Sequence, residues 1–149
     1  MSIKIEHLNK TFGSFQALRD ISLDIPDGKL TALLGPSGSG KTTLLRIIAG
    51  LENASDGRIL FGDRDISRLP VKQRNVGFVF QHYALFRHMT VAQNVAFGLE
   101  SLPRNQRPPK TEIRKTVNRL LEMIQLPELA NRYPAQLSGG EQQRVALAR

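Results

Sequence analysis

The chain has 149 residues, of which 40% are hydrophobic and 23% charged, and a formal net charge of +8, a composition typical of one globular domain with its own core. The absence of cysteine excludes disulfides and thiolate metal sites, and no apolar run approaches the ~18 residues that span a bilayer. The N-terminus has no signal-peptide segment, so we expect a protein of the cytoplasm or of a surface that faces it.

The N-terminal part of the chain predicts short strands. Residues 3–8 and 21–25 are both strand-like, and the strict alternation in Ile21–Ile25 indicates a sheet with one buried face. Residues 10–18 between them predict a loop that carries two aromatic side chains. A further short strand is predicted for residues 58–61. Together these strands predict an antiparallel layer added to a parallel α/β core.

A glycine-rich stretch, Gly35–Thr43, fits the pattern G-x-x-x-x-G-K-[ST] of the phosphate-binding loop (P-loop). In such a loop, glycines allow backbone N–H groups to point at phosphate oxygens. Lys41 can reach the β- and γ-phosphates, and the Thr42 hydroxyl can ligate Mg²⁺. The candidate nucleotide-binding residues are Gly35, Pro36, Ser37, Gly38, Ser39, Gly40, Lys41, Thr42 and Thr43.

The residues on either side support this interpretation of the glycine-rich stretch. The apolar run 30–34 predicts a buried parallel strand, and residues 44–49 predict a buried helix that ends at Gly50. Strand, loop and helix thus follow in the order that the motif requires. A flexible glycine–serine connector is the poorer alternative, because a connector does not need a Lys-Thr-Thr sequence after it. The sequence therefore predicts binding of a nucleoside triphosphate.

A second apolar run, Val76–Phe80, predicts another strand, and Gln81 follows it directly. A polar amide at this point suits a sheet whose carboxyl ends face the ligand. The spacing alone favours the simpler alternative, in which Gln81 only caps the strand in a loop.

From residue 87 onward the sequence predicts helices. Thr90 and Gln93 form the pattern of a capping box that starts a helix, and residues 101–110, with three prolines, predict a loop. Apolar residues then recur at helical spacing from Ile113 to Ile124. This pattern predicts an amphipathic helix whose apolar stripe belongs to the core.

The last motif is Leu137-Ser138-Gly139-Gly140-Glu141, in which Ser138 and Glu141 again form a capping-box pattern. Two glycines in a first helical turn cost about 1 kcal/mol each relative to alanine. Such a loss is tolerable where something must approach the backbone closely. Free N–H groups and a hydroxyl at a helix N-terminus would bind an anion well.

Taken together, the P-loop, Gln81 after a strand and Leu137–Glu141 stand in the order found in ATP-binding-cassette (ABC) ATPases, which the chain resembles over its whole length. Within that family it looks most like the ATP-binding subunits of bacterial sulfate/thiosulfate importers. The stretches that carry this likeness are residues 75–90, Phe97-Gly98-Leu99, Leu102-Pro103-Arg104 and Arg107-Pro108. The resemblance implies an α/β P-loop NTPase core with an N-terminal antiparallel β layer in residues 1–86, and a C-terminal α-helical subdomain with the signature motif in residues 87–149.

The resemblance also implies a role for each matching position. Lys41 and Gln81, the Q-loop residue, would act in catalysis, with Thr42 and Gln81 as ligands of Mg²⁺. Phe12 would stack on the adenine of ATP; Phe15 is the fallback, and a core role for either aromatic stays open. The signature residues Ser138, Gly139, Gly140 and Glu141 would contact ATP held by the P-loop of another protomer.

Partners and a location follow from the same resemblance. The partners are a second ATP-binding subunit in a homodimer, two transmembrane permease subunits received by residues 82–105, and, indirectly, a periplasmic solute-binding protein. The subunit would lie at the cytoplasmic face of the inner membrane and would bind no nucleic acid. His82 and His88 are interpreted as contact or surface residues rather than metal ligands, because no carboxylate or third histidine is nearby.

The chain departs from the family pattern in one respect. The Walker B aspartate, the catalytic glutamate and the switch histidine have no counterpart up to Arg149, so we interpret the chain as an N-terminal fragment truncated before Walker B. The activity implied for the full-length protein is that of a translocase, which hydrolyses ATP to ADP and phosphate to drive sulfate/thiosulfate import.

Three alternative functions stay open. An importer of another solute would share part of residues 75–90. A soluble ABC protein acting on nucleic acid or the ribosome would suit the positive charge, but the densest basic stretch, Arg104–Arg119, contains Glu112 and no aromatic residue, as expected of a solvated face. A small P-loop kinase would need the P-loop alone and leaves Leu137–Glu141 unexplained.

Overall fold

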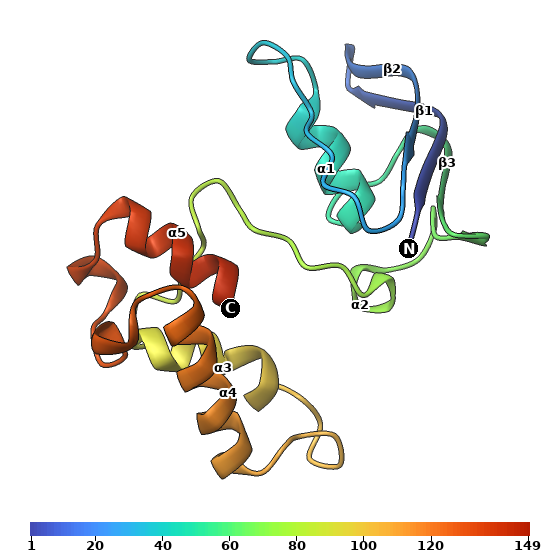
Figure 1. The fold of residues 1–149 in the computed structure, drawn as a ribbon. Helices are drawn as coiled ribbons and strands as arrows, with labels where there is room; N and C mark the ends of the chain where they lie inside the picture. The colour runs from blue at the N-terminus through green and yellow to red at the C-terminus, as the bar shows by residue number, and fades with distance from the viewer. The chain divides into compact units, whose positions relative to one another are not determined.

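The computed structural model describes all 149 residues, which form two compact units, Met1–Phe78 and Val79–Arg149. The first unit holds the strands and the helix that follows the P-loop, and the second is helical (Figure 1). No helix combines the length and the apolar character that a membrane crossing needs. The sequence predicted a boundary between the ATP-binding core and the helical subdomain at residues 86 and 87, eight residues after the boundary between the two compact units. The assignment of functions to the two parts stays a prediction.

A four-stranded antiparallel sheet, with strand order β2-β1-β3-β4, forms the larger part of the first unit. Its strands are β1 (Ile3–Phe12), β2 (Phe15–Ile25), β3 (Asp56–Phe61) and β4 (Arg64–Asp65). The predicted antiparallel layer is confirmed, but the predicted loop over residues 10–18 is wrong. β1 and β2 run on into a hairpin in which Phe12 pairs with Phe15, because Gly13, with φ of 56°, allows the chain to reverse within two residues.

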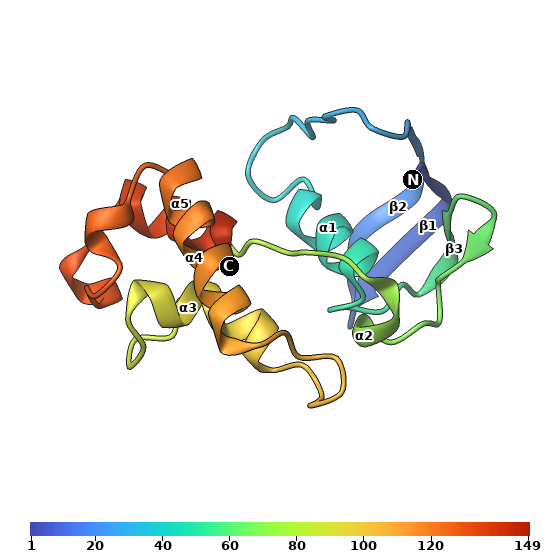
Figure 2. The same ribbon diagram turned by 60° about the horizontal axis from the view of Figure 1, so that its bottom comes forward.

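One face of the sheet is covered by α1 (Lys41–Ala49), as Figure 2 shows. Ile5, Leu8 and Ile59 of the sheet and Leu44 and Ile47 of the helix are buried together. Burial of an aliphatic side chain contributes about 1.5–3 kcal/mol, so this contact is the main source of stability in the unit. The predicted buried helix and its end at Gly50 are both confirmed.

Two predicted strands do not form. Residues 30–34 and 76–80 have no regular secondary structure, and Leu30 and Leu34 are fully exposed. A parallel strand is stabilised by hydrogen bonds to neighbouring strands, and within residues 1–149 no strand pairs with either segment. The α/β class is confirmed, but the parallel part of the predicted sheet is absent from these residues.

The loss of the second strand changes the setting of Gln81. Instead of following a strand, Gln81 lies in a turn in which the Tyr83 N–H donates to the Phe80 carbonyl at 2.9 Å. The expectation that Gln81 ends a strand is therefore wrong for this structure.

The second unit packs α3 (Val91–Glu100), α4 (Lys110–Met123) and α5 (Gly139–Ala148) around one core. Two short 3₁₀ helices, Pro127–Leu129 and Pro134–Gln136, connect α4 to α5. Val91, Val117, Leu121 and Val145 are buried at the centre. The capping boxes predicted at Thr90 and Ser138 are both present, which confirms the predicted starts of α3 and α5.

A buried arginine joins α1 to the segment before residue 75. Arg74, at the end of the short helix α2 (Val71–Arg74), is 4% exposed, and its guanidinium donates to the carbonyls of Ile47 (2.7 Å), Ile48 (3.1 Å), Ser67 (3.1 Å) and Leu69 (2.8 Å). Burial lowers its pKa. No sequence pattern marked this residue, because its partners are backbone carbonyls that lie 5 to 27 positions away in the chain.

Substitution Arg74→Leu should lower the free energy of unfolding by about 3 kcal/mol, since it leaves buried carbonyls without donors. Urea denaturation followed by circular dichroism measures the change. The matched control is Arg64→Leu on exposed β4, which should shift stability by less than about 0.5 kcal/mol. Equal effects of the two substitutions would contradict a structural role for Arg74.

Candidate nucleotide-binding site

The P-loop forms a tight turn at the N-terminus of α1. The Ser39 N–H donates to the Pro36 carbonyl at 3.3 Å, and Gly38 and Gly40 have φ of 81° and 86°. Gly40 is required for a second reason, because a Cβ there would lie 2.7 Å from the Ala17 carbonyl oxygen of β2. The loop is therefore held against the hairpin by a contact that only glycine permits.

The N-terminus of α1 differs from those of α3 and α5. Gly40 stands at its N-cap, and no side chain caps the first turn, whereas Thr90 and Ser138 close the other two helices with capping boxes. The first N–H groups of a helix have no partner within the helix. At α1 these donors and the positive end of the helix dipole are directed to the P-loop, an arrangement suited to an anion.

Lys41 adds a full positive charge to this loop. Its ammonium donates to the Gly35 carbonyl (2.9 Å), the Pro36 carbonyl (2.6 Å) and the Ser39 hydroxyl (3.0 Å). All three acceptors are neutral, and the ion pairs of the structure do not include Lys41. Its charge is thus available to a phosphate ligand.

The residues proposed for Mg²⁺ fit a hard cation that is held mainly by its ligand. Thr42 and Gln81 are exposed oxygen-bearing residues, and oxygen is the donor that Mg²⁺ prefers. No group of three or more His, Asp or Glu side chains is placed to hold a metal. A magnesium ion at the P-loop would therefore take most of its ligands from phosphate and water.

An aromatic hairpin lies beside the P-loop. The contact between Gly40 and Ala17 places the start of β2 next to α1, and Phe12 lies across from Phe15 two residues before Ala17. Phe12 and Phe15 are 45% and 63% exposed. A partly exposed ring next to a phosphate site is suited to stacking on a nucleotide base.

Lys10 holds the ring of Phe12 from one side. Its ammonium lies 4.5 Å from the ring centroid and is fixed by Glu52 Oε1 (2.8 Å) and the Asn53 carbonyl (2.7 Å). Neither Lys10 nor Glu52 was predicted from the sequence. The only available signal was a lysine two residues before the aromatic, which is weak because its partner lies 42 positions away.

The signature residues form the start of α5. The Ser138 N–H and hydroxyl donate to Glu141 Oε2 at 2.7 and 2.8 Å, and the Glu141 N–H donates back to the hydroxyl at 3.4 Å. These bonds, the backbone one first, lower the pKa of the Glu141 carboxyl. Its contribution to the cap is therefore present at neutral pH and is lost as pH falls through that lowered pKa.

The two glycines of the signature have no role inside the chain. A Cβ at Gly139 or Gly140 would meet no atom within 4 Å, and neither residue has a positive φ. Glycine at both positions lowers helix stability without any compensating contact in these 149 residues.

The candidate residues fall into two groups. Gly35–Thr43 and Phe12 lie together in the unit Met1–Phe78, whereas Gln81 and Ser138–Glu141 belong to Val79–Arg149. Within the first unit, a cavity of about 360 Å³ adjoins the loop and is lined by Leu18, Leu33, Leu44 and the P-loop residues Gly35 and Lys41.

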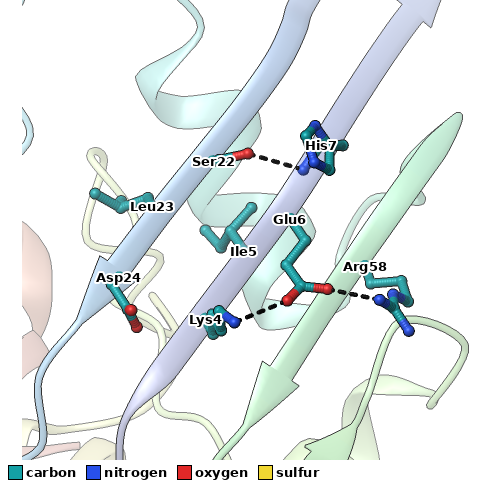
Figure 3. A pocket seen from close by; sticks show the side chains of 8 residues that line it. All are labelled: Lys4, Ile5, Glu6, His7, Ser22, Leu23, Asp24 and Arg58. Atoms are coloured by element: carbon teal, nitrogen blue, oxygen red, sulfur yellow. Dashed lines mark hydrogen bonds and ion pairs between the residues drawn. The ribbon is translucent and has the colours of Figure 1, made fainter.

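A larger hollow of about 560 Å³ lies on the sheet and is lined by residues of β1, β2 and β3 and by no residue of the P-loop (Figure 3). Three of its charged side chains are paired, since Glu6 accepts from Lys4 at 3.0 Å and from Arg58 at 2.8 Å, whereas Asp24 stands outside these ion pairs. These contacts raise the pKa of Lys4 and lower that of Glu6. Because Lys4 and Arg58 are already paired with Glu6, neither cation is free for a phosphate ligand. The hollow is therefore not the favoured nucleotide-binding site.

A P-loop at the N-terminus of a helix, an aromatic hairpin beside it and a separate helical unit whose last helix, α5, begins at the Ser138–Glu141 capping box define an ATP-binding cassette. In agreement, residues 18–149 match the model of the ABC transporter family. The chain belongs to the ABC transporter family.

Within this family, two curated relatives that are highly similar to the chain are ATP-binding proteins of one kind of importer. The chain is 64% identical over all 149 residues to the sulfate/thiosulfate import ATP-binding protein CysA 1 of Shewanella oneidensis, and 66% identical to CysA of Escherichia coli K12. It spans 40% and 41% of the length of these relatives.

Solved structures agree with the fold. The dimeric ATP-binding cassette MJ0796 bound to ADP and Pi is 34% identical, with a TM-score of 0.87 over 98% of this chain and 67% of that one. The cassette cbiO1 from Clostridium perfringens is 35% identical, with a TM-score of 0.83 over 98% of this chain and 59% of that one.

Proposed function

We propose that this chain is the nucleotide-binding part of an ATP-binding subunit that couples ATP hydrolysis to the import of sulfate or thiosulfate. The observation that carries the proposal is the P-loop with its uncapped helix and its lysine free of carboxylates. The choice of solute rests on the 64–66% identity to sulfate/thiosulfate import subunits over the whole chain.

In this proposal each group of residues has a separate task. The N–H groups of Gly38–Thr43 and the Lys41 ammonium bind the β- and γ-phosphates, and Phe12 stacks on the adenine. Thr42 and Gln81 hold Mg²⁺, which when bound neutralises charge on the phosphates. Gln81 also orients the water that attacks the γ-phosphate, and the products are ADP and inorganic phosphate.

The functional unit we propose is a dimer of two such subunits. Gly139 and Gly140 leave the backbone at the start of α5 uncovered, and no contact within the chain requires glycine at these positions. This supports close approach by a phosphate held on the P-loop of a second copy. The dimeric cassette MJ0796 is a precedent among similar proteins. Two permease subunits at the cytoplasmic face of the inner membrane would receive residues 82–105, and a periplasmic solute-binding protein would deliver the anion to them.

The test is reconstitution of the complete subunit with its permease partners in vesicles, with uptake of labelled sulfate measured with and without ATP. ATP-dependent uptake of sulfate or thiosulfate, but not of sugars or amino acids, is expected. Uptake of another solute would overturn the choice of substrate. Co-purification with nucleic acid and no membrane protein would overturn the transporter proposal.

The stacking role of Phe12 can be tested by itself. Substitution Phe12→Leu should weaken ATP binding about twofold to tenfold, because an aromatic contact contributes about 0.5–1.5 kcal/mol beyond its buried area. Binding of pyrophosphate, which has no base, should not change. Isothermal titration calorimetry measures both ligands. Phe15→Leu is the matched control, and a larger loss with that variant would assign the stacking role to Phe15.

A further inference from the structure

The segment between Gln81 and α3 has an unusual backbone. Tyr83 and Ala84 are consecutive residues with φ of 59° and 49°, and neither is glycine. A left-handed conformation of this kind costs of the order of 1 kcal/mol or more per residue and persists only where the surroundings hold it. Some contact outside the segment must therefore fix it.

One such contact comes from α3. Asn94 is fully buried; its side chain accepts from the Phe86 N–H at 2.9 Å and donates to the carbonyls of Phe86 (3.1 Å), Met89 (3.1 Å) and Thr90 (3.0 Å). This amide holds the C-terminal end of the segment to the helix that follows it.

The second contact comes from the far end of α5. Arg149 Nη1 donates to the Ala84 carbonyl at 2.6 Å, across 65 positions in the chain. The same guanidinium lies over the ring of Phe86, 4.2 Å from its centroid, and 5.8 Å from that of Phe97. The two rings are 4.4 Å apart. Arg149 thus binds the carbonyl of the strained residue Ala84 and packs on the ring of Phe86.

These contacts connect the segment after Gln81 to the signature residues Ser138–Glu141 through a single helix, α5. α5 begins at the Ser138–Glu141 capping box and ends next to Arg149, a length of about 15 Å. It packs against α3 in the core of this unit (Figure 1). A displacement of the signature end is therefore carried by the helix to Ala84, three residues from Gln81.

We propose that Arg149 is a positioning residue that fixes the segment Gln81–Phe86 to the signature helix. When the signature of one copy docks on a phosphate held by the other, Gln81 then moves with it as part of the same body. The proposal rests on the function proposed above, which gives Gln81 and the signature their ligands. It adds the physical connection between them.

The geometry also determines which substitution can replace the arginine. The structure pairs Arg149 with a carbonyl and a ring face and with no carboxylate. Methionine would keep an unbranched, flexible side chain, although a shorter one, and would lose both contacts. Lysine would keep one donor and the charge but lose the planar group that stacks on the ring, so a partial effect is expected.

The connection can be tested without ATP by attaching a label to a single introduced cysteine. The 149 residues contain no cysteine of their own, and any cysteine elsewhere in the complete subunit is first replaced by serine. A nitroxide attached at His82→Cys in the complete subunit reports the mobility of the segment by electron paramagnetic resonance. Arg149→Met should shorten the rotational correlation time about twofold, with Arg149→Lys between it and the parent. The matched control, Arg114→Met on the exposed face of α4, should leave it unchanged. An unchanged spectrum in Arg149→Met, with helix content preserved by circular dichroism, would overturn the proposed contact.

Kinetics of the reconstituted transporter test the consequence. Arg149→Met should lower kcat for ATP about tenfold or more while KM changes by less than about twofold, and Arg149→Lys should recover part of the loss. Normal kcat in a variant with a mobile label would overturn the positioning role. If the parent transporter does not turn over ATP at all, the proposed function fails, and the label experiment still decides whether Arg149 holds the segment.

Discussion

Substitution Lys41→Ala in the complete transporter is expected to reduce ATP turnover at least about a hundredfold and to abolish ATP-dependent uptake. The ammonium is the only full charge at the loop, held within 3.0 Å of three neutral oxygens. Its loss would leave the developing charge on the transferred phosphoryl group without a cation, and removal of one such electrostatic contact costs about 10²–10³ in kcat. A coupled enzymatic assay for phosphate release measures the effect.

The control for this experiment is Lys72→Ala. Lys72 is an exposed lysine of α2 in the same unit, and its removal changes net charge by the same amount. Turnover by Lys72→Ala should stay within about twofold of the parent, as for most surface substitutions. Unchanged turnover in Lys41→Ala would refute the assignment of this lysine to the β- and γ-phosphates.

Substitution Ser138→Arg is expected to block hydrolysis while leaving ATP binding to the isolated subunit intact. The arginine would occupy the open space in front of Gly139 and Gly140 and would keep a second copy from closing on α5. The P-loop belongs to the other unit of the chain, so its affinity for nucleotide should not change. Titration with ATP below the dimerisation concentration, together with a turnover assay, separates the two effects.

Ser138 also caps α5, so loss of the cap must be separated from loss of the proposed trans contact. Removal of an N-cap hydroxyl costs about 1 kcal/mol. Ser138→Thr keeps a hydroxyl at the cap, as Thr90 does in α3, and should retain hydrolysis to a large extent. Weaker ATP binding to the isolated Ser138→Arg subunit would argue against a site completed by a second copy.

Lys41→Ala and Ser138→Arg change residues in separate units of one chain. The P-loop and its hairpin are built from Met1–Phe78, and the signature and Gln81 from Val79–Arg149. Under the function proposed above, the first unit would bind the phosphates and the signature in the second would contact a nucleotide held by another copy of the chain.

Many features that the sequence predicted correctly are local. The starts of α3 and α5, the end of α1 at Gly50 and the course of the P-loop depend on residues three or four positions apart, and that spacing is visible in the sequence. The alternation of apolar residues also identified the strand at 21–25, and the further short strand predicted at 58–61 forms as part of β3. The roles of Phe12, Gln81 and Ser138–Glu141 stay predictions.

The predictions that were wrong and the residues that were not predicted depend on contacts beyond the local sequence. Residues 30–34 and 76–80 have the composition of buried strands, but a strand exists only where another pairs with it, and its partner cannot be read from its own residues. Arg74, Lys10 and Arg149 act on groups 5 to 65 positions away, so no local pattern marks them.

By itself, the sequence therefore determined the class of protein and the residues proposed to bind phosphate, because a P-loop is specified by its own consecutive residues. Only the tertiary structure decided that Phe12 lies beside this loop, that Gly139 and Gly140 are free of any internal contact, and that Arg149 reaches Ala84. These are long-range contacts, and their geometry arises from packing between elements that the chain keeps far apart.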